Sequence, residues 1–468
     1  MDTERSVVPA ALHSALAAAC PAVREASPDT DAIAGVVPSF VASPASTEES
    51  SALLRIAAAH GLTVVPRGAG TGLGWGQPPA SADLVVDLRR MDQVIEHAAG
   101  DLVARVQAGT TMGHLASVLA SAGQQLAVDA PADATVGGVV ATGTAGPRRF
   151  RYGAPRDLLI GITVVRADGV VAHSGGRVVK NVAGYDLGKL FSGSQGTLGL
   201  ITEATFRLHP LPAAQAWVTG DLGPADLAGA AAAVASAAGS ALVPSAVELL
   251  WTGGPGASPG PAMLRVGVLL EGTPSGVNER SRQMAELLAA AGATPIVAIS
   301  ETPFRWWEPE SDAPVPSREG LGPAPQAARP AGSSPRANTV VRVTFWVRQL
   351  ADVLDALATA GASAGARPAV SGAAGAGVLY ARLDPATADD TAARFVGALR
   401  DRLAGVFAGP ADSSGLVRGS VAVLAAPAAV LAMAGPDRPL PGLDLMRAVK
   451  DQFDPGHRMF PGRFHGGP

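Results

Sequence analysis

The sequence predicts an α+β protein built from two domains that differ in composition. Up to residue 212, short apolar and β-branched segments alternate with three glycine-dense stretches. Beyond Pro212, alanine-rich segments of helical character alternate with strand-like segments, and the glycine clusters disappear. With 468 residues, the chain is long enough to form two domains with separate cores.

Composition narrows the function classes. Hydrophobic residues make up 47% and charged residues 16%, which is typical of a globular protein. The net charge of −4 gives no sign of a nucleic-acid-binding surface. The single cysteine, Cys20, excludes disulfides within the chain, a cysteine-based zinc site and an iron–sulfur cluster held by this chain.

The N-terminus predicts a capped, alanine-rich helix. Residues 16–20 resemble a lipoprotein cleavage site, but Asp2 and Glu4 outweigh Arg5, so the positive start of a signal peptide is missing. The longest apolar runs are too weak to span a bilayer: 227–243 and 421–434. We therefore expect a soluble, cytoplasmic protein.

The first domain is predicted to contain two helices and seven strands. A capping-box pattern at 46–49 predicts a helix that Gly61 ends. The Asp168-Gly169 pair predicts a type I′ turn between two strands. The remaining elements are predicted from apolar and β-branched patterns: strands at 62–65, 84–88, 94–95, 102–106, 158–165, 170–173 and 200–208, and a helix at 112–120.

The first glycine-dense stretch, 66–75, directly follows the strand at 62–65. Its alternating glycines let backbone N–H groups approach an anion, and Arg67 adds a positive charge, so a phosphate-bearing cofactor is the expected ligand. The Rossmann fingerprint fails at Leu73, and no Gly-Lys-Ser/Thr completes a phosphate loop of the Walker type. Taken alone, the stretch is equally compatible with a glycine-rich surface turn.

Two further stretches have little side-chain bulk. Residues 131–146 predict backbone that approaches another group closely, and 193–199 carry glycine at every third position. That spacing suits neither a helix nor an ordinary strand, and it predicts a tight loop against a flat partner. Lys180 and Lys189 lie in this region of a chain with only three lysines, although Lys189 is more simply a solvated charge at a helix end.

The second domain is predicted from alternating helices and strands. An insertion at 309–338, rich in Pro, Gly, Ala and Ser, has little to bury and is expected at the surface. A final segment, 443–464, offers one more helix. The predicted helices are 226–240, 278–291, 349–360 and 386–403, and the predicted strands are 246–251, 264–270, 340–347 and 377–383.

Together, these stretches resemble the vanillyl-alcohol-oxidase-type flavoproteins with a PCMH-type FAD-binding domain, and most of all the FAD-binding subunits of glycolate oxidase. Five pieces occur in the order expected for that family: 66–74, 131–146, 148–153 with Arg156-Asp157, 180–203, and Phe453-Asp454-Pro455 with Pro461-Gly462-Arg463. The likeness covers residues 36–212 well and the middle of the chain poorly. Phe460 departs from it, because asparagine is usual before Pro-Gly-Arg.

The resemblance implies a PCMH-type FAD-binding domain of two subdomains (36–212) plus an α+β substrate or cap domain (213–440). A helical extension (1–35) would precede them, and a C-terminal segment (441–468) would return to the FAD domain. The residues carried over as FAD contacts by motif are Pro66, Arg67, Gly68, Ala69, Gly70, Thr71, Gly72, Leu73, Pro131, Thr135, Gly137, Gly138, Thr142, Gly143, Gly146, Gly196, Gly199 and Ile201.

Non-covalent FAD is expected. Family members that attach the flavin covalently use a histidine in or near the first loop or a cysteine in the second. Here Thr71 stands in the loop, Cys20 lies far outside, and His114 is more simply a residue of the helix at 112–120. No metal is expected, because the His-rich Gly-Asp-Gly-Asn motif of the metal-dependent relatives is missing and the eight histidines are scattered.

The catalytic residues are less well defined. Arg148, Arg149 and Arg151 are candidates for pairing with a substrate carboxylate, although pairing with FAD phosphates or surface carboxylates is the simpler role for them. Tyr152 or Lys180 is a candidate to assist deprotonation of a hydroxyl group. The predicted activity is hydride removal from a small 2-hydroxy acid of the glycolate or D-lactate type.

Two alternatives stay open. The chain is also compatible with an electron-transfer subunit that has no substrate site of its own, working with a catalytic flavoprotein and an iron–sulfur protein. A sugar or alcohol oxidase on the same scaffold is the other alternative.

Overall fold

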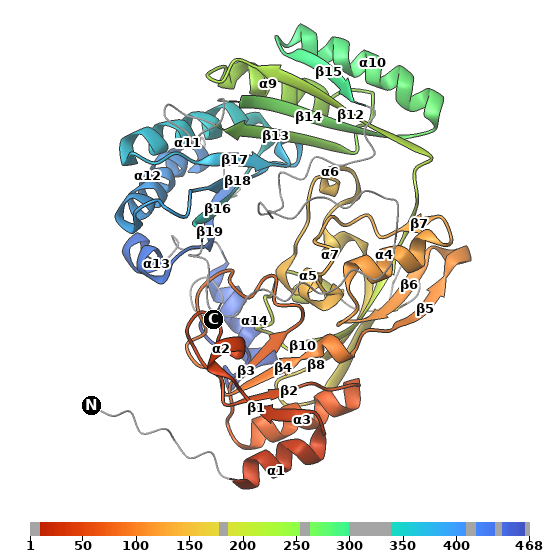
Figure 1. Cartoon of the computed structure of the whole chain (residues 1–468), viewed down its shortest axis with the longest axis vertical. Helices are drawn as coiled ribbons and strands as arrows, with labels where there is room; N and C mark the ends of the chain where they lie inside the picture. The colour runs from red at the N-terminus through yellow and green to blue at the C-terminus, as the bar shows by residue number, and fades with distance from the viewer. Residues whose placement is uncertain are drawn as a thin grey trace.

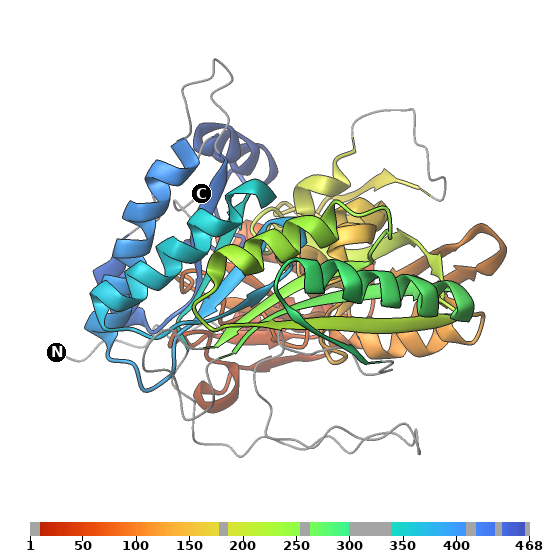
Figure 2. The same cartoon turned by 90° about the horizontal axis from the view of Figure 1, so that it is seen from above.

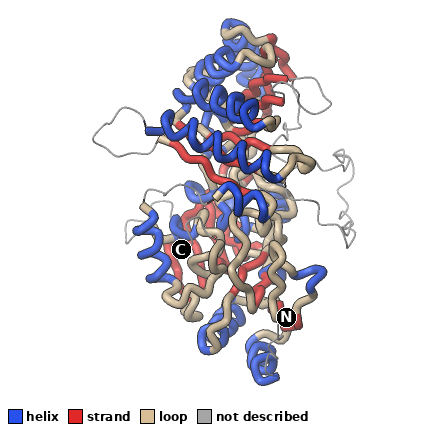
Figure 3. Tube along the Cα trace, turned by 90° about the vertical axis from the view of Figure 1, so that its left-hand side faces the viewer, coloured by secondary structure: helices blue, strands red, loops and turns tan. Residues whose placement is uncertain are grey.

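The computed structural model describes residues 10–176, 186–252, 263–298, 338–408, 418–435 and 442–463. These residues form two lobes that lie one above the other in Figure 1 and again in the side view of Figure 3. Each lobe has its own large cluster of buried apolar side chains. The α+β class predicted from the sequence is confirmed.

The lower lobe holds the N-terminal half of the chain and the C-terminal helix. Its strands are β1 (Val23–Glu25), β2 (Phe40–Ala42), β3 (Val64–Arg67), β4 (Leu84–Asp87), β5 (Val94–Ala98), β6 (Val103–Gln107), β7 (Gln124–Gln125), β8 (Leu159–Val165), β9 (Val171–Gly175), β10 (Leu200–Arg207) and β11 (His209–Pro210). Its helices are α1 (Ala10–Ala19), α2 (Pro28–Asp31), α3 (Thr47–Ala59), α4 (Met112–Ala120), α5 (Val136–Thr142), α6 (Arg149–Tyr152), α7 (Pro155–Leu158), α8 (Gly188–Phe191) and α14 (Leu443–Phe453).

Two main sheets organise this lobe. The first has the order β1-β2-β4-β3, with β4 parallel to both of its neighbours. The second is antiparallel, with the order β5-β6-β10-β8-β9. Since β1 pairs with β2, residues 23–25 contribute a strand to the first sheet, although they lie in the predicted N-terminal extension.

The capping pattern at 46–49 does begin a helix. The Ser46 hydroxyl accepts the Glu49 N–H at 3.2 Å, and the Glu49 carboxylate accepts the Ala45 N–H at 2.8 Å. These bonds satisfy N–H groups that an exposed helix start would leave to water. Leu53 and Leu54 then place the apolar side of α3 in the core.

The predicted type I′ turn at Asp168-Gly169 is wrong. The Arg166 carbonyl accepts the Gly169 N–H at 2.8 Å, and the Arg166 N–H donates to the Val170 carbonyl at 2.9 Å. Only Gly169 in this turn has a positive φ, 82°, whereas a type I′ turn needs two such residues. The loop is therefore a three-residue hairpin in which the glycine occupies the left-handed bulge position.

A helix was not predicted within 131–146, yet α5 occupies its centre. Gly137 and Gly138 disfavour helix by composition, but Thr135 caps the start and accepts the Gly138 N–H at 3.4 Å. A Cβ on Gly137 would lie 2.7 Å from the Ala108 side chain. Tight packing against Ala108, the residue after β6, therefore requires glycine inside this helix.

The upper lobe is one eight-stranded antiparallel sheet with helices on one face. Its order is β15-β12-β14-β13-β17-β18-β16-β19. Figure 2 shows the helices lying over this sheet. The strands are β12 (Ala214–Leu222), β13 (Ala246–Thr252), β14 (Met263–Gly272), β15 (Thr294–Ala298), β16 (Val340–Phe345), β17 (Ala369–Gly372), β18 (Val378–Arg382) and β19 (Gly419–Ala425); the helices are α9 (Leu227–Ala238), α10 (Pro274–Ala290), α11 (Leu350–Ala364), α12 (Asp389–Ala408) and α13 (Ala428–Ala434).

All eight elements predicted for this lobe are present with shifted ends, and β12, β15, β17, β19 and α13 were missed. Most of the predicted insertion at 309–338 lies outside the described residues. The other face of the sheet turns toward the lower lobe, where Phe150 of α6 packs against the upper core. The predicted domain limits remain a proposal.

The end of the chain returns to the first sheet. Met459 forms a parallel bridge with Val64 of β3. The Val64 N–H donates to the Arg458 carbonyl at 2.8 Å, and the Phe460 N–H donates to the Val64 carbonyl at 2.8 Å. Residues 454–463, here called the C-terminal tail, therefore lie directly beside the strand that leads into the first glycine-dense stretch.

Candidate cofactor site

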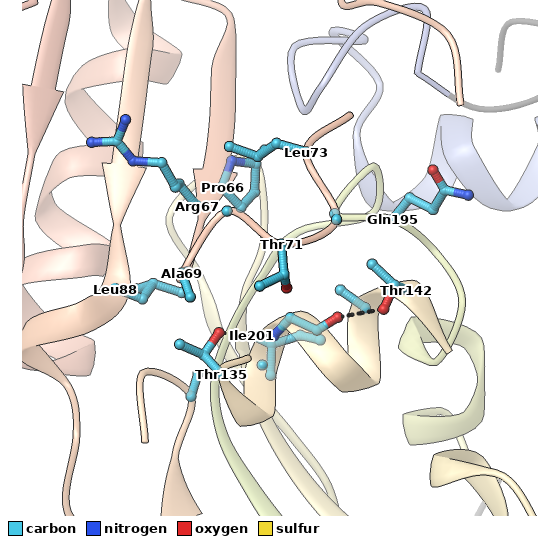
Figure 4. A pocket seen from close by; sticks show the side chains of 18 of the residues that line it. Pro66, Arg67, Ala69, Thr71, Leu73, Leu88, Thr135, Thr142, Gln195 and Ile201 are labelled. Atoms are coloured by element: carbon cyan, nitrogen blue, oxygen red, sulfur yellow. Dashed lines mark hydrogen bonds between the residues drawn. The ribbon is translucent and has the colours of Figure 1, made fainter. Parts of the chain in front are cut away.

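A pocket opens in the lower lobe where the three glycine-dense stretches meet (Figure 4). It lies between the loop after β3, the helix α5 and the segment that leads into β10. Its lining residues are Pro66, Arg67, Gly68, Ala69, Gly70, Thr71, Gly72, Leu73, Leu88, Ala108, Thr135, Gly137, Gly138, Ala141, Thr142, Gln195, Gly196, Gly199, Ile201, Phe460 and Arg463. Of the residues predicted to contact a cofactor, only Pro131, Gly143 and Gly146 are outside this lining.

The loop after β3 approaches α5 without intervening side chains. A Cβ on Gly68 would lie 2.0 Å from the Thr135 hydroxyl oxygen, so only glycine permits this approach. Gly70 has a φ of 84°, in the left-handed region that glycine adopts readily. Residues 66–74, here called the glycine loop, thus bring their backbone close to α5 along one wall of the pocket.

The positive charge of Arg67, expected from the sequence, is neutralised within the chain. Its guanidinium pairs with Asp87 at 3.1 Å and with Asp31 at 3.0 Å, both of them buried carboxylates. In Figure 4 its side chain points away from Thr71 and Thr135. The charge of Arg67 therefore anchors the base of the loop to the first sheet.

Arg463, from the C-terminal tail, was missed as a site residue. Its guanidinium donates to the carbonyls of Gly72 at 2.7 Å and Leu73 at 3.0 Å, and to the Gln195 side-chain oxygen at 3.1 Å. Burial lowers the pKa of Arg463 to about 10. Arg463 belongs to the Pro-Gly-Arg motif noted in the sequence, but no local sequence pattern predicts its contact with Gly72, 391 positions away.

Phe460 also lines the pocket, and its backbone explains why asparagine is usual there. Its φ is 46°, a left-handed conformation that asparagine tolerates better than a bulky aromatic residue. The Arg463 guanidinium carbon lies 4.8 Å from the centre of the Phe460 ring. This cation–π contact is available only to an aromatic side chain.

Arg148, a predicted substrate-binding residue, is committed within the chain. Its side chain donates to Asp129 at 2.7 Å and to Gln125 at 2.5 Å. A guanidinium that already pairs with a carboxylate is a poor partner for a substrate carboxylate. Arg148 therefore stabilises the segment between the second glycine stretch and α6.

Tyr152 reaches the upper lobe. Its hydroxyl donates to the Glu271 carboxylate of β14 at 2.8 Å. The His209 ring packs edge-on against the Tyr152 ring, with 4.7 Å between the two ring centres. Burial and the Glu271 charge raise the pKa of Tyr152 to about 12. Burial lowers the pKa of His209. This group lies between the lobes, outside the lining of the pocket.

The other candidate residues occupy varied positions. Arg151 is exposed, and its guanidinium lies 3.5 Å from the Ser245 hydroxyl across the lobe boundary. Arg149 is half-buried on α6. Lys180 lies outside the described residues. Lys189 is an exposed charge paired with Asp186 at 3.3 Å.

Thr71 lines the pocket, whereas Cys20 is buried in the core behind α1 and α3, and burial raises its pKa. His114 is exposed on α4. Over the described ranges, no group of three or more His, Cys, Asp or Glu side chains is arranged to hold a metal ion. None of the helices described has the length and apolar character needed to cross a bilayer.

Comparison with known proteins identifies the cofactor. Residues 38–175 match the family model described as an FAD binding domain. The glycolate oxidase subunit GlcD of Bacillus subtilis (strain 168) is 39% identical over 178 residues, which cover 38% of each chain. The probable mitochondrial D-lactate dehydrogenase of Danio rerio is 40% identical over 178 residues, 37% of this chain and 36% of the relative. The match thus spans less than two fifths of either relative's length.

Solved structures show the same fold over nearly the whole chain. p-Cresol methylhydroxylase with substrate bound has a TM-score of 0.70 at 17% identity and covers 97% of this chain and 96% of its own. Chitooligosaccharide oxidase has a TM-score of 0.64 at 15% identity, with 96% and 97% covered. Residues 38–175 of this chain are therefore an FAD-binding domain of the PCMH type, and its cofactor is FAD.

The lining of the pocket fits this cofactor. FAD combines a diphosphate with a flat isoalloxazine ring, and the pocket combines a glycine loop with small residues of α5 and of the segment before β10. Backbone N–H groups in such a loop bind anions, and the shortage of side chains leaves room for a flat ring.

Proposed function

We propose that this chain is an FAD-dependent oxidoreductase that acts on a small 2-hydroxy acid of the glycolate or D-lactate type. The pocket formed by three segments distant in sequence carries this proposal, because it suits a flavin dinucleotide. Support for the substrate class comes from relatives named for glycolate, D-lactate and D-2-hydroxyglutarate oxidation. We further propose a cytoplasmic location, as the sequence suggests.

In this proposal FAD supplies a hydride acceptor at its flavin ring. The glycine loop binds the diphosphate through backbone N–H groups, and α5 with the segment before β10 supports the ring. The chain orients both partners of the transfer, which is the main contribution a protein makes to such a reaction.

Arg151 is the arginine of α6 that we favour for the substrate carboxylate. It is exposed at the boundary between the lobes, whereas Arg148 pairs with Asp129. Arg149 remains a second choice because it is half-buried. Tyr152 is a weaker candidate for proton transfer, because its hydroxyl already donates to Glu271 and its pKa is raised to about 12.

Anaerobic reduction tests this function. The purified chain, loaded with FAD, is mixed with glycolate or D-lactate while the flavin absorbance is followed. Bleaching by either acid, and its loss in Arg151→Gln with FAD still bound, is the expected result. A fully loaded chain that stays yellow with both acids and with D-2-hydroxyglutarate would refute the activity of the isolated chain.

One observation favours an electron-transfer subunit as the second candidate. Arg148 and Tyr152, two of the groups predicted to handle substrate, are engaged by Asp129 and Glu271. The relative from Bacillus subtilis is named as a subunit. In this alternative the partners are a catalytic flavoprotein and an iron–sulfur protein. Bleaching that appears only when a partner protein is added would support it.

We also propose that FAD is held without a covalent bond, since Thr71 occupies the loop and Cys20 is buried elsewhere. Acid precipitation separates the two possibilities. Yellow colour in the supernatant is expected, whereas a yellow pellet would mean a covalent link.

A further inference from the structure

Two arginines line the pocket, and they differ in whether a carboxylate neutralises their charge. Arg67 pairs with two carboxylates, Asp31 and Asp87. Arg463 is 3% exposed, and its hydrogen bonds in the described part of the chain all go to neutral oxygens. Its positive charge is thus buried beside the pocket without an anionic partner among those bonds.

A buried guanidinium of this kind is expensive unless an anion joins it. The lowered pKa of Arg463, about 10, has desolvation as its cause. Arginine has five N–H donors, and the contacts with Gly72, Leu73, Gln77 and Gln195 use four of them. One N–H group on Nη2 is left for a ligand.

The same contacts orient the glycine loop. Arg463 holds the carbonyl oxygens of Gly72 at 2.7 Å, Leu73 at 3.0 Å and Gln77 at 3.3 Å. Carbonyls that are held by a cation cannot turn toward an anion in the pocket. Their engagement therefore favours the loop conformation in which N–H groups are available to a phosphate.

The tail that carries Arg463 is itself fixed to this region. Met459 bridges to Val64 of β3, and the Ala80 N–H donates to the Pro461 carbonyl at 2.8 Å. The guanidinium is thus held between the glycine loop and Gln195, two walls of one pocket.

We propose that Arg463 is the cationic partner of the FAD diphosphate and that the C-terminal tail is thereby an integral part of the cofactor site. The inference rests on FAD binding in this pocket. It places the charge on a residue almost four hundred positions from the loop, and not on Arg67 within it.

Titration of the FAD-free full-length chain with FAD tests this assignment, with flavin fluorescence as the readout at low and high salt. Arg463→Gln removes the charge and is expected to weaken FAD binding about tenfold or more. Arg463→Lys keeps the charge and is expected to retain most of the affinity. Arg458→Gln is the matched control, since Arg458 lies in the same tail and donates to the Ala167 carbonyl, outside the pocket.

Salt dependence separates charge from loop support. If Arg463 acts on the diphosphate through its charge, salt should weaken FAD binding less in Arg463→Gln than in the wild type. Equal losses in Arg463→Gln and Arg463→Lys with an unchanged salt dependence would overturn the proposal, as would wild-type affinity in Arg463→Gln. If the Gln variant does not fold, Arg463→Lys decides: retained affinity supports the charge, and a loss beyond tenfold refutes it. A wild-type chain that bound no FAD would instead refute the cofactor site as a whole.

Discussion

The Nζ atom of Lys450 lies 2.7 Å from Oδ2 of Asp454, and both side chains are buried, at 2% and 0% exposure. Lys450 also donates to the Thr197 carbonyl at 2.7 Å and to the Met459 carbonyl at 3.0 Å. Asp454 in turn accepts the Met459 N–H at 2.7 Å. One ion pair thus joins α14, the C-terminal tail and the segment leading into β10.

Breaking this pair from one side should be costly. Asp454→Ala leaves a buried ammonium without its carboxylate and is expected to lower the free energy of unfolding by about 3–5 kcal/mol. The double variant Lys450→Met/Asp454→Ala should lose less than the sum of the losses in Lys450→Met and Asp454→Ala, because no charge is left buried. Urea denaturation measures all four proteins.

The exposed pair Arg447–Asp444 on the same helix is the matched control for this cycle. Its atoms are 3.4 Å apart with side chains 52% and 101% exposed, so its removal should change stability by less than about 1 kcal/mol. Strictly additive effects at Lys450 and Asp454 would show that the two side chains do not act as a pair.

A feature of this site was predictable where the residues that define it are close together in the sequence. The glycine loop was predicted because β-branched residues followed by alternating glycines are recognisable within ten residues. The ion pairs of Arg67 were not predicted, because Asp31 and Asp87, which neutralise its charge, are 36 and 20 positions away. Sequence pattern identifies a charge but not its partner.

The fold likewise contains elements that local sequence patterns predict and elements that depend on distant contacts. Helix α12 and strand β14 have strong periodic patterns and were found, with only their ends shifted. Helix α5 was missed because Gly137 and Gly138 look unfavourable for helix until packing against Ala108 is known. Arg463 was noticed in its motif, but its contacts depend on the whole chain returning to β3.

Gly70 should control FAD retention through its backbone. An added Cβ would come no closer than 3.6 Å to its neighbours, so the penalty comes from its φ of 84° and not from filled space. A side chain in that conformation costs about 1–2 kcal/mol and favours another loop shape. Gly70→Ala is therefore expected to bind FAD about tenfold more weakly in a fluorescence titration. Gly74→Ala, with nothing within 4 Å of its Cβ, should bind normally. Equal affinity in both variants would count against an ordered loop.

Asp31 should make stability depend on acid pH. The guanidinium of Arg24, with help from the Ser27 N–H and Arg67, holds the pKa of its carboxyl well below the usual range. A carboxyl whose pKa is lowered in the folded state stabilises the fold at neutral pH, and this contribution is lost as pH falls below about 4. Asp31→Asn is expected to cost about 2 kcal/mol at pH 7, since Arg67 is largely buried while Arg24 is half-exposed.

The measurement for Asp31 is denaturation of wild type and Asp31→Asn across a pH series. The gap between the two proteins should narrow steadily as the solution is acidified. A gap that stays constant down to pH values well under about 4 would mean that ionisation of Asp31 contributes nothing.

Tyr152 and Glu271 should link the two lobes in a pH-dependent way at the alkaline end. Tyr152→Phe leaves the Glu271 carboxylate, 5% exposed, without the hydroxyl that donates to it at 2.8 Å, and about 1–3 kcal/mol of stability should be lost. Because the folded-state pKa of Tyr152 is raised from 10.0 to about 12, this contribution is complete below pH 10 and declines as pH rises toward 12.

Ultraviolet titration of the chain's three tyrosines should show one ionising late, and that step should be missing in Tyr152→Phe. Tyr380→Phe is the control for the spectrum. If the late step survives in Tyr152→Phe and disappears in the control, the raised pKa belongs to another tyrosine and the contact between the lobes does not protect this phenol.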